Sequence, residues 1–98
     1  MGRPASRFGD ADIVHCSVPF RANGSFNVLI NGLFASRAYI DVNTPHLKHG
    51  KPCRPHQATI STGSATVRIN GLPAARTGDN IGGCTSVGMG SPNVFIGG

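Results

Sequence analysis

Apolar and polar positions alternate in three short stretches of the chain. Each stretch holds a valine and an isoleucine two residues apart, at Val28/Ile30, Val67/Ile69 and Val94/Ile96. Because neighbouring side chains of a strand point to opposite faces, the alternation predicts three short strands, each of which buries its Val/Ile face. No apolar run keeps the helical period over the length of a helix. The pattern therefore predicts an all-β fold.

Turn signals follow two of these stretches. Asn31-Gly32 and Asn70-Gly71 come directly after the isoleucines. Both residue types tolerate a positive φ, and the pair is a strong signal for the tight turn of a β-hairpin. The Ala-x-Arg segment after each turn is too short for a helix, so we expect it to form the return strand of a hairpin.

The hairpin segments are near-copies of one another. Residues 24–37 read GSFNVLINGLFASR, and residues 63–76 read GSATVRINGLPAAR. A partial copy, GSPNVFIGG at 90–98, closes the chain, and the end of a copy, PASRFGD at 4–10, opens it. Such self-similarity predicts hairpins stacked about an approximate threefold axis around one thin core, with the units cut at a different point from where each begins. An ordinary β-meander would explain the strands equally well, but not the copied turns and Ala-x-Arg segments.

The composition limits the size and class of the protein. With 98 residues, 39% of them hydrophobic, and no Trp, residues 1–98 are expected to form one domain with a small core. A core of this kind usually needs a disulfide, a metal ion or a partner chain. The net charge of +5 comes from scattered basic residues without interleaved aromatic residues. We therefore expect no nucleic-acid partner; a solvated basic surface or an acidic protein partner fits better.

The N-terminal sequence bears on the compartment in which the chain is made. MGRPASR is not followed by an apolar signal region, and no stretch is long and apolar enough to span a membrane. We expect synthesis in the cytoplasm and any export by a route that needs no signal peptide. In that reducing compartment, the three cysteines are interpreted as thiols or metal ligands and not as a disulfide framework: Cys16, Cys53 and Cys84.

Metal-binding residue types recur at one position of the repeat. They stand five residues after the repeated aspartates Asp10, Asp41 and Asp79, as His15, His46 and Cys84. A threefold arrangement of the units would bring all three to one point on the axis. Their common position therefore indicates a metal site at that point.

A fourth ligand would have to come from the insertion between the second and third repeated segments. One Cys and three His would complete a closed tetrahedral zinc shell. We favour His56, because it lies just before the strand that leads to Gly63, while His49 and Cys53 are its rivals.

Catalytic residues are scarce outside this set of ligands. The acidic residues are four aspartates, three of them in the repeated turn, and three serines belong to the repeated Gly-Ser turn: Ser25, Ser64 and Ser91. The alternatives are a small zinc-dependent hydrolase and a stand-alone metal-binding protein. A hydrolase would need three protein ligands and an open position for water. We expect a structural protein and not an enzyme.

The sequence GSATVRINGLPAARTGD at 63–79 resembles the PAAR-repeat family, which is named after the tetrapeptide found here at 73–76. The resemblance extends over essentially the whole chain. It implies a small cone of β-hairpins whose broad base binds the blunt end of a trimeric β-helical spike, one chain per trimer. It also implies one structural zinc ion near the apex, held at the positions of His15, His46, His56 and Cys84. The copy at 24–41 departs from the pattern, with Phe34 in place of Pro and Tyr39-Ile40 where a glycine is expected.

Proteins of this family form the membrane-piercing tip of the spike in type VI secretion systems and in contractile phage tails. The resemblance thus implies a spike-tip protein that is assembled in a secretion apparatus or a phage virion and contacts the target membrane transiently. Only a few residues precede the first Arg-x-Gly-Asp motif and none follows Gly98, so we expect no effector within this chain. The residues that contact the spike, the recruitment of effector cargo and the choice between a phage tail and a secretion system stay open at the level of the sequence.

Overall fold

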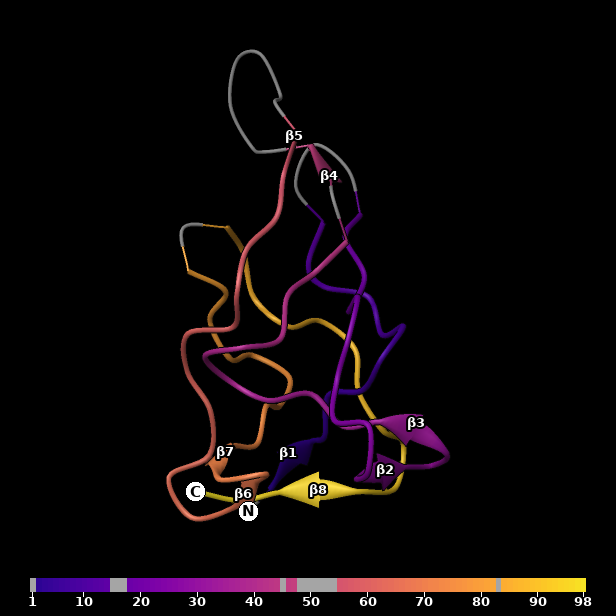
Figure 1. Ribbon diagram of the computed structural model, residues 1–98, viewed down its shortest axis with the longest axis vertical. Helices are drawn as coiled ribbons and strands as arrows, with labels where there is room; N and C mark the ends of the chain where they lie inside the picture. Colours follow the sequence, from indigo (N-terminus) through magenta and orange to yellow (C-terminus); the bar gives the residue numbers. More distant parts are fainter. Residues whose placement is uncertain (1, 15–17, 45, 48–54, 83) are drawn as a thin grey trace.

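The computed structural model describes residues 2–14, 18–44, 46–47, 55–82 and 84–98. Its strands are two residues long and pair into antiparallel two-stranded sheets, and no helix occurs among the described residues (Figure 1). The prediction of an all-β fold built from short hairpins is confirmed. No helix in this part of the chain has the length and apolar character needed to cross a membrane.

Three hairpins lie together at one end of the long axis, which we call the base (Figure 1). They consist of β2 (Leu29–Ile30) with β3 (Leu33–Phe34), β6 (Arg68–Ile69) with β7 (Leu72–Pro73), and β8 (Phe95–Ile96) with β1 (Arg3–Pro4). All three have the same register, because Ile30, Ile69 and Ile96 stand opposite Leu33, Leu72 and Arg3. The first and last strands thus complete the third hairpin, and the two ends of the chain meet at the base. This confirms that the units are cut at a different point from where each begins.

The turns of the two continuous hairpins adopt the backbone expected from their sequence. Asn31 and Asn70 both have φ 54°, and the glycines that follow have φ 79° and 81°. Positive φ at both central residues is typical of the type I′ turn, whose twist matches that of a hairpin. The Asn-Gly signals therefore predicted both turns correctly.

The core of the base is formed by equivalent side chains of the three units. It contains Ile30, Ile69, Ile96, Ala5, Ala35 and Ala74, with Val28 and Val94 packed against it. The residues between the valine and the isoleucine point outward, so that Leu29 and Phe95 are 55% and 57% exposed. One part of the prediction is wrong: Val67 is 38% exposed, although its carbonyl accepts the Ala74 N–H just as the equivalent valine carbonyls accept those of Ala35 and Ala5.

A closed ring of backbone hydrogen bonds links the three return strands. The Ser6 N–H donates to the Ala75 carbonyl, the Ala75 N–H to Ser36, and the Ser36 N–H to Ser6, each at 3.0 Å. All three residues are fully buried. Because each unit donates to one neighbour and accepts from the other, the ring fixes the pseudo-threefold axis.

A second apolar layer follows the ring along the axis. It contains Ala38, Ile60, Ala75, Ile81 and Val87, with Ala58 and Cys84 packed against it. Ile60 and Val87 each stand three residues before the glycine that opens a repeat, and the equivalent residue of the remaining unit is Arg21. Arg21 forms an ion pair of 2.6 Å with Asp12, and both side chains are 0% exposed. A buried ion pair therefore stands in this unit where the other two have an aliphatic side chain.

The divergent copy at 24–41 keeps the geometry of the others. Tyr39 takes φ 75° at the position where Gly9 and Gly78 have φ 85° and 84°. Its N–H donates to the Ile60 carbonyl at 2.7 Å, as the N–H groups of Gly9 and Gly78 do to Arg21 and Val87. The unit thus retains a left-handed residue at this point, at the strain that such a φ imposes on a tyrosine.

The fourth hairpin lies at the end of the molecule opposite the base (Figure 1). It pairs β4 (His46–Leu47) with β5 (Pro55–His56), and the register places His46 opposite His56. We refer to this end as the apex.

Candidate metal centre

Each repeated aspartate holds the arginine that precedes it in a clamp. The Oδ2 atom accepts the backbone N–H and the Nε–H of the arginine, and the Oδ1 atom accepts a hydrogen bond from Nη2. The ion pairs measure 2.9, 2.9 and 3.1 Å for Arg7–Asp10, Arg37–Asp41 and Arg76–Asp79. The hydrogen bonds to Asp10 and Asp41 raise the pKa values of Arg7 and Arg37. The aspartates are buried, so each clamp fixes the start of a segment that runs toward the apex.

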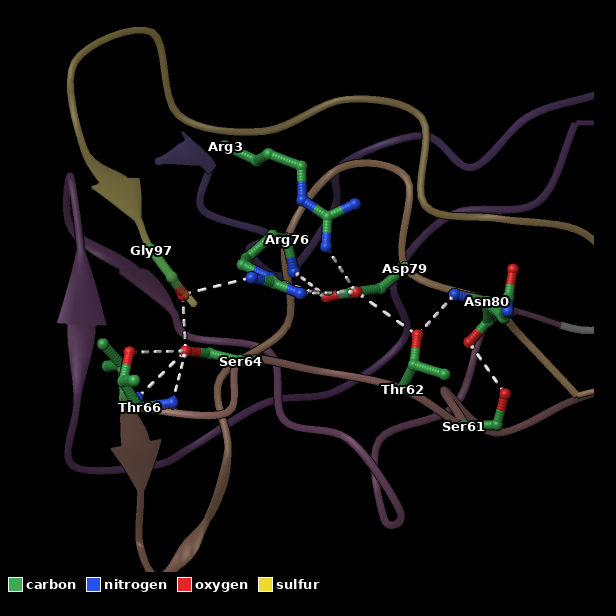
Figure 2. A network of polar contacts seen from close by, with 10 residues as sticks. Arg3, Ser61, Thr62, Ser64, Thr66, Arg76, Asp79, Asn80 and Gly97 are labelled. Atoms are coloured by element: carbon green, nitrogen blue, oxygen red, sulfur yellow. Dashed lines mark hydrogen bonds and ion pairs between the residues drawn. The ribbon is translucent and has the colours of Figure 1, made fainter. Parts of the chain in front are cut away.

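The same arginines connect each unit to the next. In each case the Nη1 group of the arginine is the donor. Arg7 donates to the Asn31 side chain (3.0 Å), Arg37 to the Asn70 side chain (3.2 Å) and Arg76 to the Gly97 carbonyl (3.1 Å). These three acceptors occupy one equivalent position in the three hairpins, so the contacts form a closed cycle. Figure 2 shows the Arg76 member, in which Asp79 also accepts hydrogen bonds from Arg3 at 3.0 Å and Thr62 at 3.2 Å.

The serines of the Gly-Ser segments organise turns. Ser25, Ser64 and Ser91 are buried, and each Oγ accepts the N–H groups of the residues two and three positions later. The glycine before each serine faces the return strand: a Cβ on Gly24 or Gly63 would lie 2.8 Å from its nearest neighbouring atom, and one on Gly90 2.7 Å. These contacts confirm that the serines belong to turns.

Cys84 is the predicted ligand whose side chain the structure describes. It is half-buried and packs against the second apolar layer. Burial raises the pKa of its thiol, whereas a hydrogen bond from Asn43 acts in the opposite direction. The Asn43 Nδ2 atom lies 3.6 Å from Sγ.

The two histidines of the fourth hairpin stand opposite each other on its two strands. His46 and His56 are directly paired positions of the antiparallel strands β4 and β5. Their side chains lie outside the described part of the structure, as do His15, His49, Cys53 and Cys16 as whole residues. Among the side chains that the structure describes, no three His, Cys, Asp or Glu groups converge, and the ligand set remains a prediction.

The residues present nevertheless suit a structural zinc ion. A thiol and imidazoles are the donors that tetrahedral zinc sites use. Asn43 accepts the Ala58 N–H on Oδ1 at 2.9 Å, so the residue that contacts the Cys84 sulfur also holds the strand that leads away from His56. The Asn43 side chain thus links Cys84 to the strand that leads away from His56.

Two features were not predicted from the sequence. The buried Arg21–Asp12 pair and the fully buried Asn43 occupy positions that are apolar in other units, namely those of Ile60 and Ile81. Alignment of the repeats beyond the aspartate would have identified them as polar residues at core positions. Their partners depend on tertiary contacts, which the alignment does not supply.

Comparison with known proteins places the chain in a family. The PAAR motif matches residues 50–98, half of the chain. The chain is 44% identical over 77 residues to the NAD(P)(+) glycohydrolase toxin Tse6 of Pseudomonas aeruginosa PAO1 and to the (p)ppApp synthetase toxin Tas1 of P. aeruginosa UCBPP-PA14. Each alignment covers 76% of this chain and 18% of the toxin, so the chain spans less than a fifth of these relatives. The matched residues 50–98 include the Arg76–Asp79 clamp and the hairpin of β6 and β7, and the chain belongs to the PAAR-motif family.

Proposed function

We propose that this protein is the tip of the spike of a contractile injection machine, with its base on a trimeric β-helical spike and its apex pointing forward. The observation that carries the proposal is the base, in which three hairpins of one register surround a single axis. A trimeric β-helix ends in three identical strand ends. A single chain with a pseudo-threefold base can contact all three in the same way, so we propose one chain per trimer.

Exposed apolar side chains at the base support a partner there. Phe26, Leu29 and Phe95, which lie in or next to the base hairpins, are 81%, 55% and 57% exposed. A partner that binds this end would remove these side chains from water. A spike that covers them would also protect the edges of the short strands from pairing with other chains.

We further propose one structural zinc ion at the apex, held by His15, His46, His56 and Cys84. The ion would cross-link segments from all three units where the molecule has little volume for a core. The pairing of His46 with His56 and the position of Cys84 beside Asn43 support this assignment. A closed shell of four protein ligands leaves no open position for a reactive water, which distinguishes this role from that of a zinc hydrolase.

The relatives support type VI secretion as the setting. Both are named as toxins and share with this chain less than a fifth of their length. A domain that accompanies toxins of different activity fits a shared role in delivery. We therefore propose that the chain is assembled at the secretion apparatus, contacts the target membrane transiently and travels with effector cargo.

Binding to the spike tests the proposal. The trimeric spike protein of the same organism is mixed with this chain, and the mass of the complex is measured by light scattering after size exclusion. We expect a stable complex that is lost in the Leu29→Glu/Phe95→Glu variant, because charges would enter the covered surface. Met89→Glu is the matched control, since Met89 is 59% exposed but lies outside the base hairpins. Loss of binding in the control, or full binding by the double variant, would contradict the proposed interface.

A further inference from the structure

Asn43 lies where three parts of the proposed metal site meet. We propose that Asn43 is a positioning residue, whose side-chain N–H group donates to the Cys84 sulfur and directs it toward the metal ion. This inference rests on the zinc site of the proposed function and assigns to that site a residue beyond its ligands.

The hydrogen bonds of Asn43 determine the orientation of its amide. Its Oδ1 atom accepts the Ala58 N–H at 2.9 Å, and a backbone N–H can only donate. The Nδ2 atom is therefore the one that faces the Cys84 sulfur, at 3.6 Å. The sulfur thus receives a donor and not a carbonyl oxygen.

Asn43 also holds the strands that lead to the fourth hairpin. Its backbone N–H donates to the Ala58 carbonyl at 3.2 Å, and its own carbonyl accepts the Gln57 side chain at 3.1 Å. Asn43 stands three residues before His46, and Ala58 stands two residues after His56. Asn43, through its side chain and its backbone, therefore links the sulfur to both segments that lead to the paired histidines.

The repeat shows that packing alone does not require a polar residue here. The equivalent residue of one unit is Ile81, which is 2% exposed and part of the second apolar layer. In the other unit it is Asp12, whose charge is paired with Arg21. Asn43 is 0% exposed, and a buried amide is unfavourable unless its polar atoms have partners. An asparagine at this position is explained by what it binds, namely the Ala58 N–H and the sulfur.

The chemistry of a thiolate ligand gives this contact a role. A cysteine binds zinc as the thiolate, and hydrogen bonds to an ionised acceptor are stronger than those to a neutral one. The Asn43 N–H group would therefore stabilise the metal-bound sulfur and hold its direction. Removal of partners of metal ligands typically lowers metal affinity by about 10–100-fold.

The variant Asn43→Asp tests the role of the donor. Aspartate keeps an oxygen for the Ala58 N–H but presents a second oxygen to the sulfur in place of the N–H group. We expect zinc affinity, measured by competition with a chelator, to fall by about 10-fold or more, and the sulfur-to-cobalt charge-transfer band of the cobalt-loaded protein to shift. Asn23→Ala is the matched control, because it removes a hydrogen bond to the Val42 N–H next to Asn43 without touching Asn43 or Cys84, and its affinity and band should match those of the wild type.

Unaltered affinity and an unaltered cobalt band in folded Asn43→Asp would overturn the inference. If that variant does not fold, the wild-type protein is loaded with NMR-active cadmium and measured by NMR. We expect a scalar coupling between the metal nucleus and the Asn43 amide protons. Absence of that coupling in protein that shows coupling to the Cys84 Hβ protons would equally overturn it. Failure of the wild type to bind zinc, cobalt or cadmium would instead contradict the metal site of the proposed function.

Discussion

The substitution Asp41→Asn removes the charge from the most buried of the three repeated aspartates. Asp41 is 0% exposed. It accepts the Arg37 backbone N–H at 2.7 Å and the Arg37 Nε and Nη2 groups at 2.9 Å each. An asparagine has one acceptor oxygen in place of two, so its NH₂ group would face a donor of Arg37. The variant would therefore keep the shape of the clamp but lose both its charge and one of its acceptors.

The burial of the ion pair sets the expected loss in the free energy of unfolding. Breaking a buried ion pair by removing one partner costs about 3–5 kcal/mol. The Arg37 side chain is 13% exposed and can recover some hydration. We therefore expect a loss in the free energy of unfolding of about 3 kcal/mol, at the lower end of this range. Since domains are stable by about 5–15 kcal/mol, this is a large share of the total. At about 4–8 °C per kcal/mol for a domain of this size, Tm should fall by roughly 12–24 °C.

Urea unfolding is the assay, and it is carried out at a fixed excess of free zinc because a bound metal would itself add stability. The free energy of unfolding should fall with an unchanged m value, which shows that the folded state buries the same surface. Arg68→Ala is the control: Arg68 is exposed and its hydrogen bond to Gly71 is long, at 3.4 Å, so its effect should stay within about 0.5 kcal/mol. A loss below about 1 kcal/mol in Asp41→Asn would refute the view that the buried clamps are a main source of the stability of the fold.

Two further predictions concern a glycine and the ligands. Gly63→Ala should destabilise the protein by about 1–3 kcal/mol in thermal unfolding, because its Cβ would lie 2.8 Å from the nearest atom of the return strand; Gly97→Ala, with nothing within 4 Å, should change stability little, and equal effects would contradict the argument from close approach. His56→Ala should lower zinc affinity by several orders of magnitude in a chelator competition while Cys53→Ser leaves it nearly unchanged; the reverse result would identify Cys53 as the fourth ligand.

The architecture was predictable because its signals are local and repeated. Asn31-Gly32 and Asn70-Gly71 specify their turns by the backbone freedom of two adjacent residues. The copied segments at the two ends of the chain predicted that the units are cut at a different point from where each begins. The structure shows the result, a hairpin formed by β8 and β1.

The exceptions arise where tertiary context overrides the repeat. Val67 shares its pattern with Val28 and Val94 but is more exposed, as burial depends on neighbours that the three units do not share. Arg21 occupies a position that is filled by aliphatic residues in the other units, and only the three-dimensional arrangement shows that Asp12 neutralises it there. For the metal centre, the common spacing from the aspartates selected Cys84, which the structure places beside Asn43, but spacing says nothing of such a partner.

In the proposed assembly, one chain caps one trimeric spike and carries one zinc ion. Native mass spectrometry of the complex with the trimeric spike protein measures both numbers at once. We expect a single species with the mass of the trimer, one copy of this chain and one zinc ion. A complex of three chains per trimer would contradict it, because three copies would make the pseudo-threefold base of each chain unnecessary.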